Sequence, residues 1–206
     1  MLTKESQAAL TPADAIGRLK EGNARFVEGR SKSRNLPAEA AATAAGQYPF
    51  AVILSCLDSR QPVELIFDQG IGDLFNARVA GNILNDDILG SLEFACKVSG
   101  AKLIVVLGHT DCGAVKGAID RVELGHLPGL LERIQPAIDS VPSNSGSGDS
   151  KNKDYVQKVA DSNVAITKAQ IVIRSPILRE MLEQRQIGLV GGMYDLSTGR
   201  VRFFPD

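Results

Sequence analysis

The sequence predicts an α/β fold with a mostly parallel central sheet flanked by helices, an N-terminal helical arm and a C-terminal edge hairpin. Two short apolar runs, at residues 50–55 and 103–107, have the continuous hydrophobicity of strands covered on both faces. Segments of helical periodicity lie between the predicted strands, and this alternation produces parallel pairing through right-handed crossovers. A turn at residues 197–199 predicts that the last strand folds back at an edge of the sheet.

Capping residues, Pro and Gly predict where the individual helices begin and end. Thr11 is the expected N-cap of the first helix, with Pro12 at its first position and Gly29 at its end. Asn85 is the expected cap of a helix over residues 86–98, which Gly100 ends. The other helices are expected at residues 62–67, 128–138, 154–174 and from Pro176 onward, and the strands at residues 50–55, 74–80, 103–107, 187–194 and 201–204.

Length and composition indicate one domain over residues 1–206. The chain has 206 residues, of which 44% are apolar, enough to bury one core and too few for two comfortable ones. Residues 1–35 form the predicted helical arm of this domain. Residues 142–153 are polar, rich in Gly and Ser and without periodicity, so they predict an exposed, flexible loop.

Charge and hydropathy argue against nucleic acid and membranes as partners. The 23 Lys and Arg residues nearly balance the 24 Asp and Glu residues, so the net charge of −1 creates no broad field toward either. No apolar stretch approaches the ~20 residues that span a bilayer, and the N-terminus lacks the pattern of a signal peptide. Three cysteines cannot all pair within the chain, so we expect reduced thiols and a cytoplasmic location, or a periplasmic one if a signal peptide has been removed.

Cys56, His109 and Cys112 form the candidate metal site. Cys56 follows one predicted buried strand, and His109 follows another, with Cys112 three residues later. The carboxyl ends of parallel strands line the binding crevice of an open sheet, so these side chains are expected to meet there. Two thiolates and an imidazole suit a catalytic zinc ion that keeps its fourth position open. Cys96 has the apolar spacing of a helix core and is not expected to bind metal.

Asp58 and Arg60 lie two and four residues after Cys56, close enough to form a bidentate ion pair beside the metal. Such pairs are most often solvated and of little consequence, but the position beside a candidate ligand favours a role here. A carboxylate held ionised by an arginine accepts a proton from metal-bound water in a hydrogen bond and orients it.

Together these motifs, Cys56-Leu57-Asp58-Ser59-Arg60 and His109-Thr110-Asp111-Cys112-Gly113, resemble the signature of the plant-like subgroup of β-class carbonic anhydrases. The resemblance spans roughly residues 47–119. It implies a Zn²⁺ cofactor on the three ligands, a catalytic dyad of Asp58 and Arg60, and zinc-bound hydroxide that attacks carbon dioxide to give bicarbonate and a proton. In some members of the family the aspartate binds the metal as a fourth ligand and closes the site.

The resemblance also implies a substrate pocket and an assembly. Gln47 occupies the position of an amide that donates to a bound oxyanion, and Gly113 offers a backbone N–H. The apolar wall is expected from Phe75, Ala80 and Phe94, which suits a nonpolar gas. The family forms dimers in which N-terminal helices embrace the partner, so a homodimer or homotetramer is expected.

Two departures from the family pattern affect proton transfer. Phe94 and Val98 stand where plant-like members carry a Tyr and a His that are thought to pass protons outward. His126, the other histidine, lies in a loop flanked by Gly and Pro and is interpreted as a surface residue. Protons are therefore expected to leave to water or buffer.

Other functions remain open at this point. The same scaffold and ligands suit hydrolysis of carbon disulfide or carbonyl sulfide, and access to the pocket decides between these substrates. A non-enzymatic protein with a structural zinc ion, or with a redox pair of Cys56 and Cys112, is the third hypothesis. Against a structural site, such zinc favours compact Cys-x-x-Cys motifs over ligands separated by a whole crossover.

Overall fold

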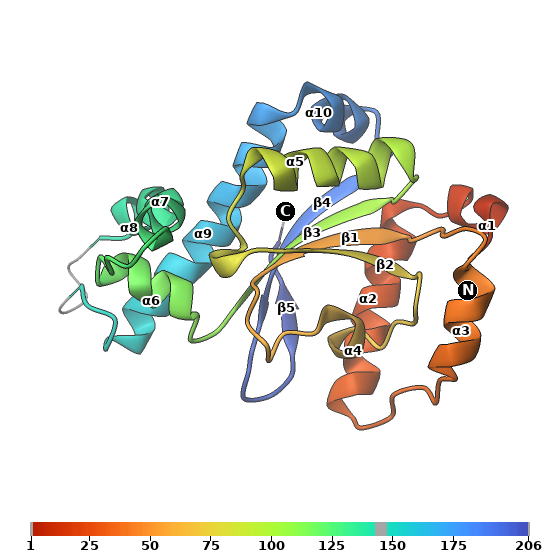
Figure 1. Cartoon of the computed structure of the whole chain (residues 1–206), viewed down its shortest axis with the longest axis horizontal. Coiled ribbons are helices and arrows are strands. Elements are labelled where there is room, and N and C mark those ends of the chain that lie inside the picture. The colour runs from red at the N-terminus through yellow and green to blue at the C-terminus, as the bar shows by residue number, and fades with distance from the viewer. Residues whose placement is uncertain (1, 143–147, 206) are drawn as a thin grey trace.

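The computed structural model describes residues 2–142 and 148–205 of the chain. Its centre is a five-stranded sheet in the order β2-β1-β3-β4-β5 (Figure 1). The first four strands pair in parallel, and β5 pairs antiparallel with β4 at one edge, so the predicted sheet and terminal hairpin are confirmed. The strands are β1 Ala51–Ser55, β2 Leu74–Arg78, β3 Leu103–His109, β4 Gly188–Tyr194 and β5 Val201–Phe203.

Helices precede, connect and follow the strands. Those within the described residues are α1 Lys4–Ala8, α2 Pro12–Val27, α3 Leu36–Thr43, α4 Val63–Ile66, α5 Asp86–Glu93, α6 Gly113–Ile119, α7 Leu127–Leu131, α8 Gln135–Ser140, α9 Lys153–Arg174 and α10 Pro176–Glu183. Among the described residues, no helix combines the length and the apolar character needed to cross a membrane.

Helices cover both faces of the sheet, and alternate residues of each strand point to opposite faces. Val52 and Leu54 of β1 contribute to a core shared with α5, α9 and α10. Ala51 and Ile53 contribute to a smaller core shared with α2 and α4. Figure 1 shows α5 and α10 on one side of the sheet and α2 and α4 on the other. This double cover explains why the sequence of β1 is apolar without alternation.

The first long helix begins where its cap predicts. The Thr11 hydroxyl accepts a hydrogen bond from the Asp14 main-chain N–H, and the Asp14 carboxylate accepts one from the Thr11 N–H. This reciprocal pair satisfies two donors that a helix start leaves free. Ala15 and Leu19 of α2 are fully buried against the sheet, so this part of the predicted arm packs on its own chain.

Several predicted boundaries were wrong. The helix expected over 128–138 is broken, because a 3-10 turn at Glu132–Ile134 separates α7 from α8. The helix expected over 86–98 changes at Phe94–Val98 to a π-helical turn. α1, α3 and α6 were not predicted. Residues 143–147 of the loop expected at 142–153 lie outside the described residues, and Asn152 already caps α9.

Candidate metal centre

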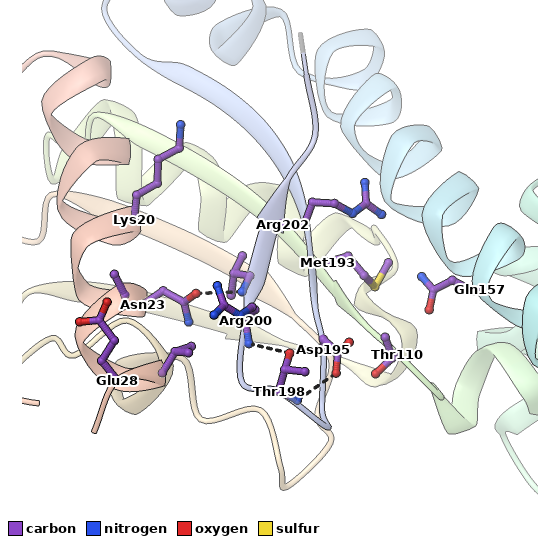
Figure 2. A pocket seen from close by; sticks show the side chains of 13 residues that line it. Lys20, Asn23, Glu28, Thr110, Gln157, Met193, Asp195, Thr198, Arg200 and Arg202 are labelled. Carbon is purple, nitrogen blue, oxygen red and sulfur yellow. Dashed lines mark hydrogen bonds between the residues drawn. The ribbon is translucent and has the colours of Figure 1, made fainter. Parts of the chain in front are cut away.

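A cavity of about 660 Å³ lies between α2, the β4–β5 hairpin and α9 (Figure 2). Two polar side chains on its wall, Asn23 and Asp195, already bind main-chain groups. Asn23 Oδ1 accepts from the Val201 N–H at 2.8 Å, and Asp195 Oδ1 accepts from the Thr198 N–H at 3.1 Å. Thr110 is the residue on this wall that adjoins the candidate metal ligands. Among the described residues, no residue on the cavity wall has a buried side-chain polar atom without a hydrogen-bond partner.

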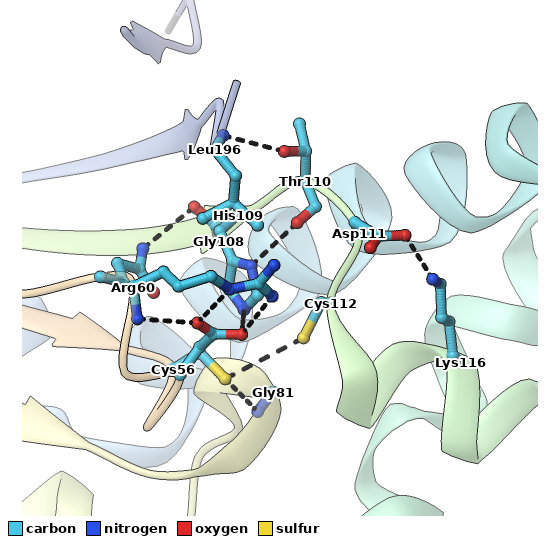
Figure 3. Close-up of polar contacts among 12 residues, drawn as sticks. Cys56, Arg60, Gly81, Gly108, His109, Thr110, Asp111, Cys112, Lys116 and Leu196 are labelled. Atoms are coloured by element: carbon cyan, nitrogen blue, oxygen red, sulfur yellow. Dashed lines mark hydrogen bonds and ion pairs between the residues drawn. The ribbon is translucent and has the colours of Figure 1, made fainter. Parts of the chain in front are cut away.

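The three predicted ligands meet at the carboxyl ends of two neighbouring strands (Figure 3). Cys56 follows β1, His109 is the last residue of β3, and Cys112 immediately precedes α6. Their ligand atoms lie within 4.8 Å of one another, and the two sulfur atoms are 4.0 Å apart. All three residues are buried. The predicted juxtaposition is confirmed, although His109 belongs to the strand and does not follow it.

The imidazole of His109 has one nitrogen in a hydrogen bond and one without. Nδ1 lies 2.9 Å from the carbonyl oxygen of Thr110 and donates to it, which leaves a lone pair on Nε2. Nε2 is buried and has no hydrogen-bond partner among the described residues. A buried polar atom left unpaired costs about 1–3 kcal/mol. Facing two sulfur atoms, this nitrogen fits a metal ion.

The pKa values of the two cysteines shift in opposite directions. The Cys56 and Cys112 sulfur atoms form a hydrogen bond at 4.0 Å, and this bond lowers the pKa of Cys56 to about 4. The Gly81 N–H also donates to Cys56, at 3.3 Å. The pKa of Cys112 is raised, first by the hydrogen bond with Cys56 and then by burial. A bound divalent cation favours the thiolate form of both residues.

Gly81 approaches Cys56 in a conformation that suits glycine. Its φ angle is +70°, and a Cβ atom there would lie 2.8 Å from the side chain of Ile134.

Cys96, unlike Cys56, is surrounded by apolar groups, and burial raises its pKa to about 12. It is not part of the metal-ligand group. The sequence predicted this difference between Cys96 and the two cysteines of the metal-ligand group, Cys56 and Cys112.

Asp58 and Arg60 form the predicted bidentate pair. Arg60 Nε donates to Asp58 Oδ1 at 2.9 Å, and Arg60 Nη2 donates to Oδ2 at 2.7 Å. This guanidinium holds the pKa of Asp58 well below its usual range. Asp58 Oδ2 lies 3.9 Å from Nε2 of His109. An ionised carboxylate thus stands beside the three ligand atoms.

Two of the predicted pocket residues, Ala80 and Gly113, adjoin groups of the site, whereas Phe75 pairs with Val52, about 13 Å along β1 from Cys56. Ala80 directly precedes Gly81, and Gly113 follows Cys112 at the start of α6 with open space at its Cα. The rings of Phe75 and Phe94 pack edge to face, with centroids 6.5 Å apart, and Phe94 is 52% exposed.

Gln47 does not join the cluster within one chain. It lies in the exposed loop before β1, at the amino end of that strand, whereas Cys56 follows the carboxyl end. The five residues of β1 span about 17 Å at a rise of ~3.3 Å per residue. The order of residues along a parallel strand separates Gln47 from the ligands.

No titratable side chain occupies the two positions noted for proton transfer. Phe94 is half exposed, and Val98 is 71% exposed on the same π-helical turn. His126 is exposed at the start of α7, as expected for a surface residue.

Sequence reasoning missed two side chains that contact the ligand-bearing segments. Gln61 is fully buried, and its Nε2 donates to the carbonyl oxygens of Leu107 and Gly108, both at 3.3 Å. Arg78 donates to main-chain carbonyls after β1. Two features of the sequence could have identified them: Gln61 is a polar residue directly after Arg60, and Arg78 is a cationic residue at the end of β2.

Comparison with known proteins gives a consistent result. A family model described as carbonic anhydrase matches residues 51–201. Carbonic anhydrase 2 of Mycobacterium tuberculosis is 41% identical over 195 residues, covering 92% of this chain and 91% of the relative. A carbonic anhydrase of Pseudomonas aeruginosa is 31% identical over 161 residues, covering 75% of this chain and 73% of the relative.

Solved structures agree with the sequence matches. The β-carbonic anhydrase CafA of Aspergillus fumigatus has a TM-score of 0.74 at 26% identity, covering 93% of this chain and 89% of that one. The β-carbonic anhydrase CcaA has a TM-score of 0.74 at 25% identity, covering 92% and 95%.

Proposed function

The chain belongs to the β-class carbonic anhydrase family, and we propose that Cys56, His109 and Cys112 hold one zinc ion with which it hydrates carbon dioxide reversibly to bicarbonate and a proton. The observation that carries the proposal is the buried Nε2 of His109, which has no partner among the described residues and faces two sulfur atoms.

The donor set fits zinc in particular. Two thiolates and one imidazole bind zinc in catalytic sites that use three protein ligands. The sulfur atoms, 4.0 Å apart, are close to the separation that two Zn–S bonds of about 2.3 Å require in a tetrahedral site. When bound, zinc supplies a Lewis acid that makes water a nucleophile near neutral pH.

The side chains around the site divide the remaining tasks. Asp58, kept ionised by Arg60, accepts the proton of a water molecule at the site in a hydrogen bond and so orients its oxygen toward carbon dioxide. Ala80, which precedes the Gly81 that contacts Cys56, offers an apolar contact to the gas, and the Gly113 N–H is available to an oxygen of bicarbonate. Protons then leave to water or buffer.

We further infer a homodimer as the smallest complete unit. Gln47 lies at the wrong end of β1 to reach the site of its own chain, so a second copy would have to bring it there. A groove of about 660 Å³ near this loop is lined by the exposed side chains of Leu36, Leu65 and Ile71. Sedimentation of the wild type as a dimer and of Leu65→Glu as a monomer is expected, and a wild-type monomer with full activity would contradict this inference.

Carbon dioxide hydration measured together with zinc content tests the central proposal. We expect one zinc ion per chain and rapid hydration by stopped flow, with carbonyl sulfide and carbon disulfide turned over far more slowly. Cys96→Ala is the matched control, since it removes a buried thiol outside the ligand group. A zinc-loaded protein that hydrolyses carbon disulfide and leaves carbon dioxide unchanged would favour the alternative substrates.

A further inference from the structure

Arg78 ends β2, the edge strand beside β1, and its side chain reaches the segment that carries Cys56 and Asp58. Its Nε donates to the carbonyl oxygen of Cys56 at 2.9 Å, and its Nη2 donates to that of Asp58 at 2.5 Å. Building on the proposed function, we propose that Arg78 is a positioning residue, which holds the Cys56 sulfur and the Asp58 carboxylate in register through their main chain.

The segment needs such a contact because the β-ladder ends at this point. The last main-chain hydrogen bond between β1 and the β2 side runs from the Val79 N–H to the Ser55 carbonyl, at 3.2 Å. The next carbonyls that point this way, those of Cys56 and Asp58, receive the guanidinium of Arg78 instead. The planar guanidinium of Arg78 therefore supplies the hydrogen bonds that main-chain N–H groups supply within the strand.

The Asp58 carbonyl is where this contact matters most. It also accepts the Gln61 N–H at 3.0 Å, which closes the turn that contains Asp58 and Arg60. Both acceptor positions of this oxygen are thus used, one by the turn and one by Arg78. Displacing the carbonyl moves the carboxylate of the same residue relative to the three ligand atoms.

The two arginines near Asp58 have different tasks. Arg60 binds the carboxylate and is 54% exposed, so it sets the charge state of Asp58. Arg78 is partly buried, and its hydrogen bonds among the described residues go to main-chain carbonyls. Losing Arg60 therefore alters the protonation of Asp58, whereas losing Arg78 alters the place of Asp58 and of the Cys56 ligand.

Lysine cannot replace this contact. A guanidinium presents two parallel N–H donors on one edge, and an ammonium group on a flexible stem reaches one acceptor at a time. Arg78→Lys therefore keeps the charge and removes the bridge between the two carbonyls. Arg202→Lys is the matched control, because Arg202 lies on β5, the opposite edge strand, and pairs with Asp161 at 3.2 Å away from the ligands.

The test measures release of zinc from the loaded protein to an excess of a chromogenic chelator. Changes in contacts that support metal ligands typically weaken metal binding about 10–100-fold, and we expect Arg78→Lys to release zinc faster by that factor. Arg78→Met should do at least as much, and Arg202→Lys should stay within about threefold of wild type. In Arg78→Lys the turnover number should fall more than the Michaelis constant rises, because Asp58 is displaced from its water.

The outcomes separate this inference from the proposed function. A wild-type protein without zinc or hydration activity removes both. If the wild type holds zinc and turns over, zinc release from Arg78→Lys at the wild-type rate overturns the positioning role. A role in folding alone is distinguished by the melting temperature of the metal-free protein: a lower value for Arg78→Lys, combined with wild-type zinc release from the folded state, also overturns the proposal.

Discussion

The ligand cluster after β1 and β3 and the cavity beside the β4–β5 hairpin differ in how their polar atoms are satisfied. The cavity has a volume of about 660 Å³, yet Asn23 and Asp195 on its wall already bind neighbouring main-chain groups. The cluster contains a buried Nε2 of His109 without a partner among the described residues. Burying an unpaired polar atom is unfavourable, whereas a polar side chain that binds its neighbours carries no such cost. Unsatisfied atoms therefore indicate the functional region better than empty volume does.

The largest effect on activity is expected when a candidate ligand is removed from the cluster. We expect Cys112→Ala to lose stoichiometric zinc and to lower kcat/KM by more than about 100-fold, beyond the effect of losing a supporting contact. Metal analysis after gel filtration and stopped-flow hydration measure the two effects. Full zinc and full activity in this variant would remove Cys112 from the ligand set.

The next largest effect is expected at Asp58. Asp58→Asn keeps the shape of the side chain but loses the anionic acceptor, so we expect zinc content near wild type and a 10- to 100-fold lower turnover number, roughly the cost of losing a group beside a metal ligand. Arg60 holds the pKa of Asp58 well below its usual range, so its titration should be absent from the wild-type activity profile between about pH 6 and 9. Equal activity of the variant across that range would contradict the assigned role.

A smaller effect is expected from the route by which protons leave the cluster. Phe94 and Val98 are exposed and cannot titrate, so the turnover number at saturating carbon dioxide should rise severalfold with buffer concentration. The ratio kcat/KM should respond far less, because it reports the steps up to bicarbonate release. A high turnover number in dilute buffer would reveal another route, and His126→Ala would then test the remaining histidine.

The smallest effect is expected at the cavity. Lys20 and Arg200 line it and are exposed, and substitution of such surface residues usually changes stability by no more than about 0.5 kcal/mol. We expect Lys20→Ala and Arg200→Ala to keep kcat/KM within about twofold of wild type. A tenfold loss in either variant would show that the cavity is coupled to the cluster, with Thr110 as the shared residue to examine.

The sequence predicted the cluster because its geometry depends mainly on where two buried parallel strands end. Continuous apolar runs identified β1 and β3 as buried parallel strands, and residues after such strands share one edge of the sheet. The meeting of Cys56 and His109 follows without knowledge of the intervening helices. The same rule places Gln47, which precedes β1, at the opposite edge of the sheet.

Other features depend on information that local patterns do not carry. α3 has no buried residue, so it lacks the apolar stripe by which surface helices are recognised. The contact of Arg78 depends on the register that pairs it with Ser55, and register follows from the packing of the whole sheet. Gln61 can be buried because its amide donates to two carbonyl oxygens near the end of β3, which lie 46 and 47 residues away in the chain.

The division of the candidate ligands between the ends of β1 and β3 also affects how the proposed zinc ion would bind. Cys56 and Cys112 are 56 residues apart in the chain, and closing such a loop carries an entropic cost that precedes any benefit from binding. The pair His109 and Cys112 alone offers two local donors, so an unfolded chain has no complete site. Zinc should therefore bind tightly only after the two strands have paired, and it then slows their separation. In kinetic terms, the proposed ion would stabilise the folded topology after it has formed and would not nucleate it.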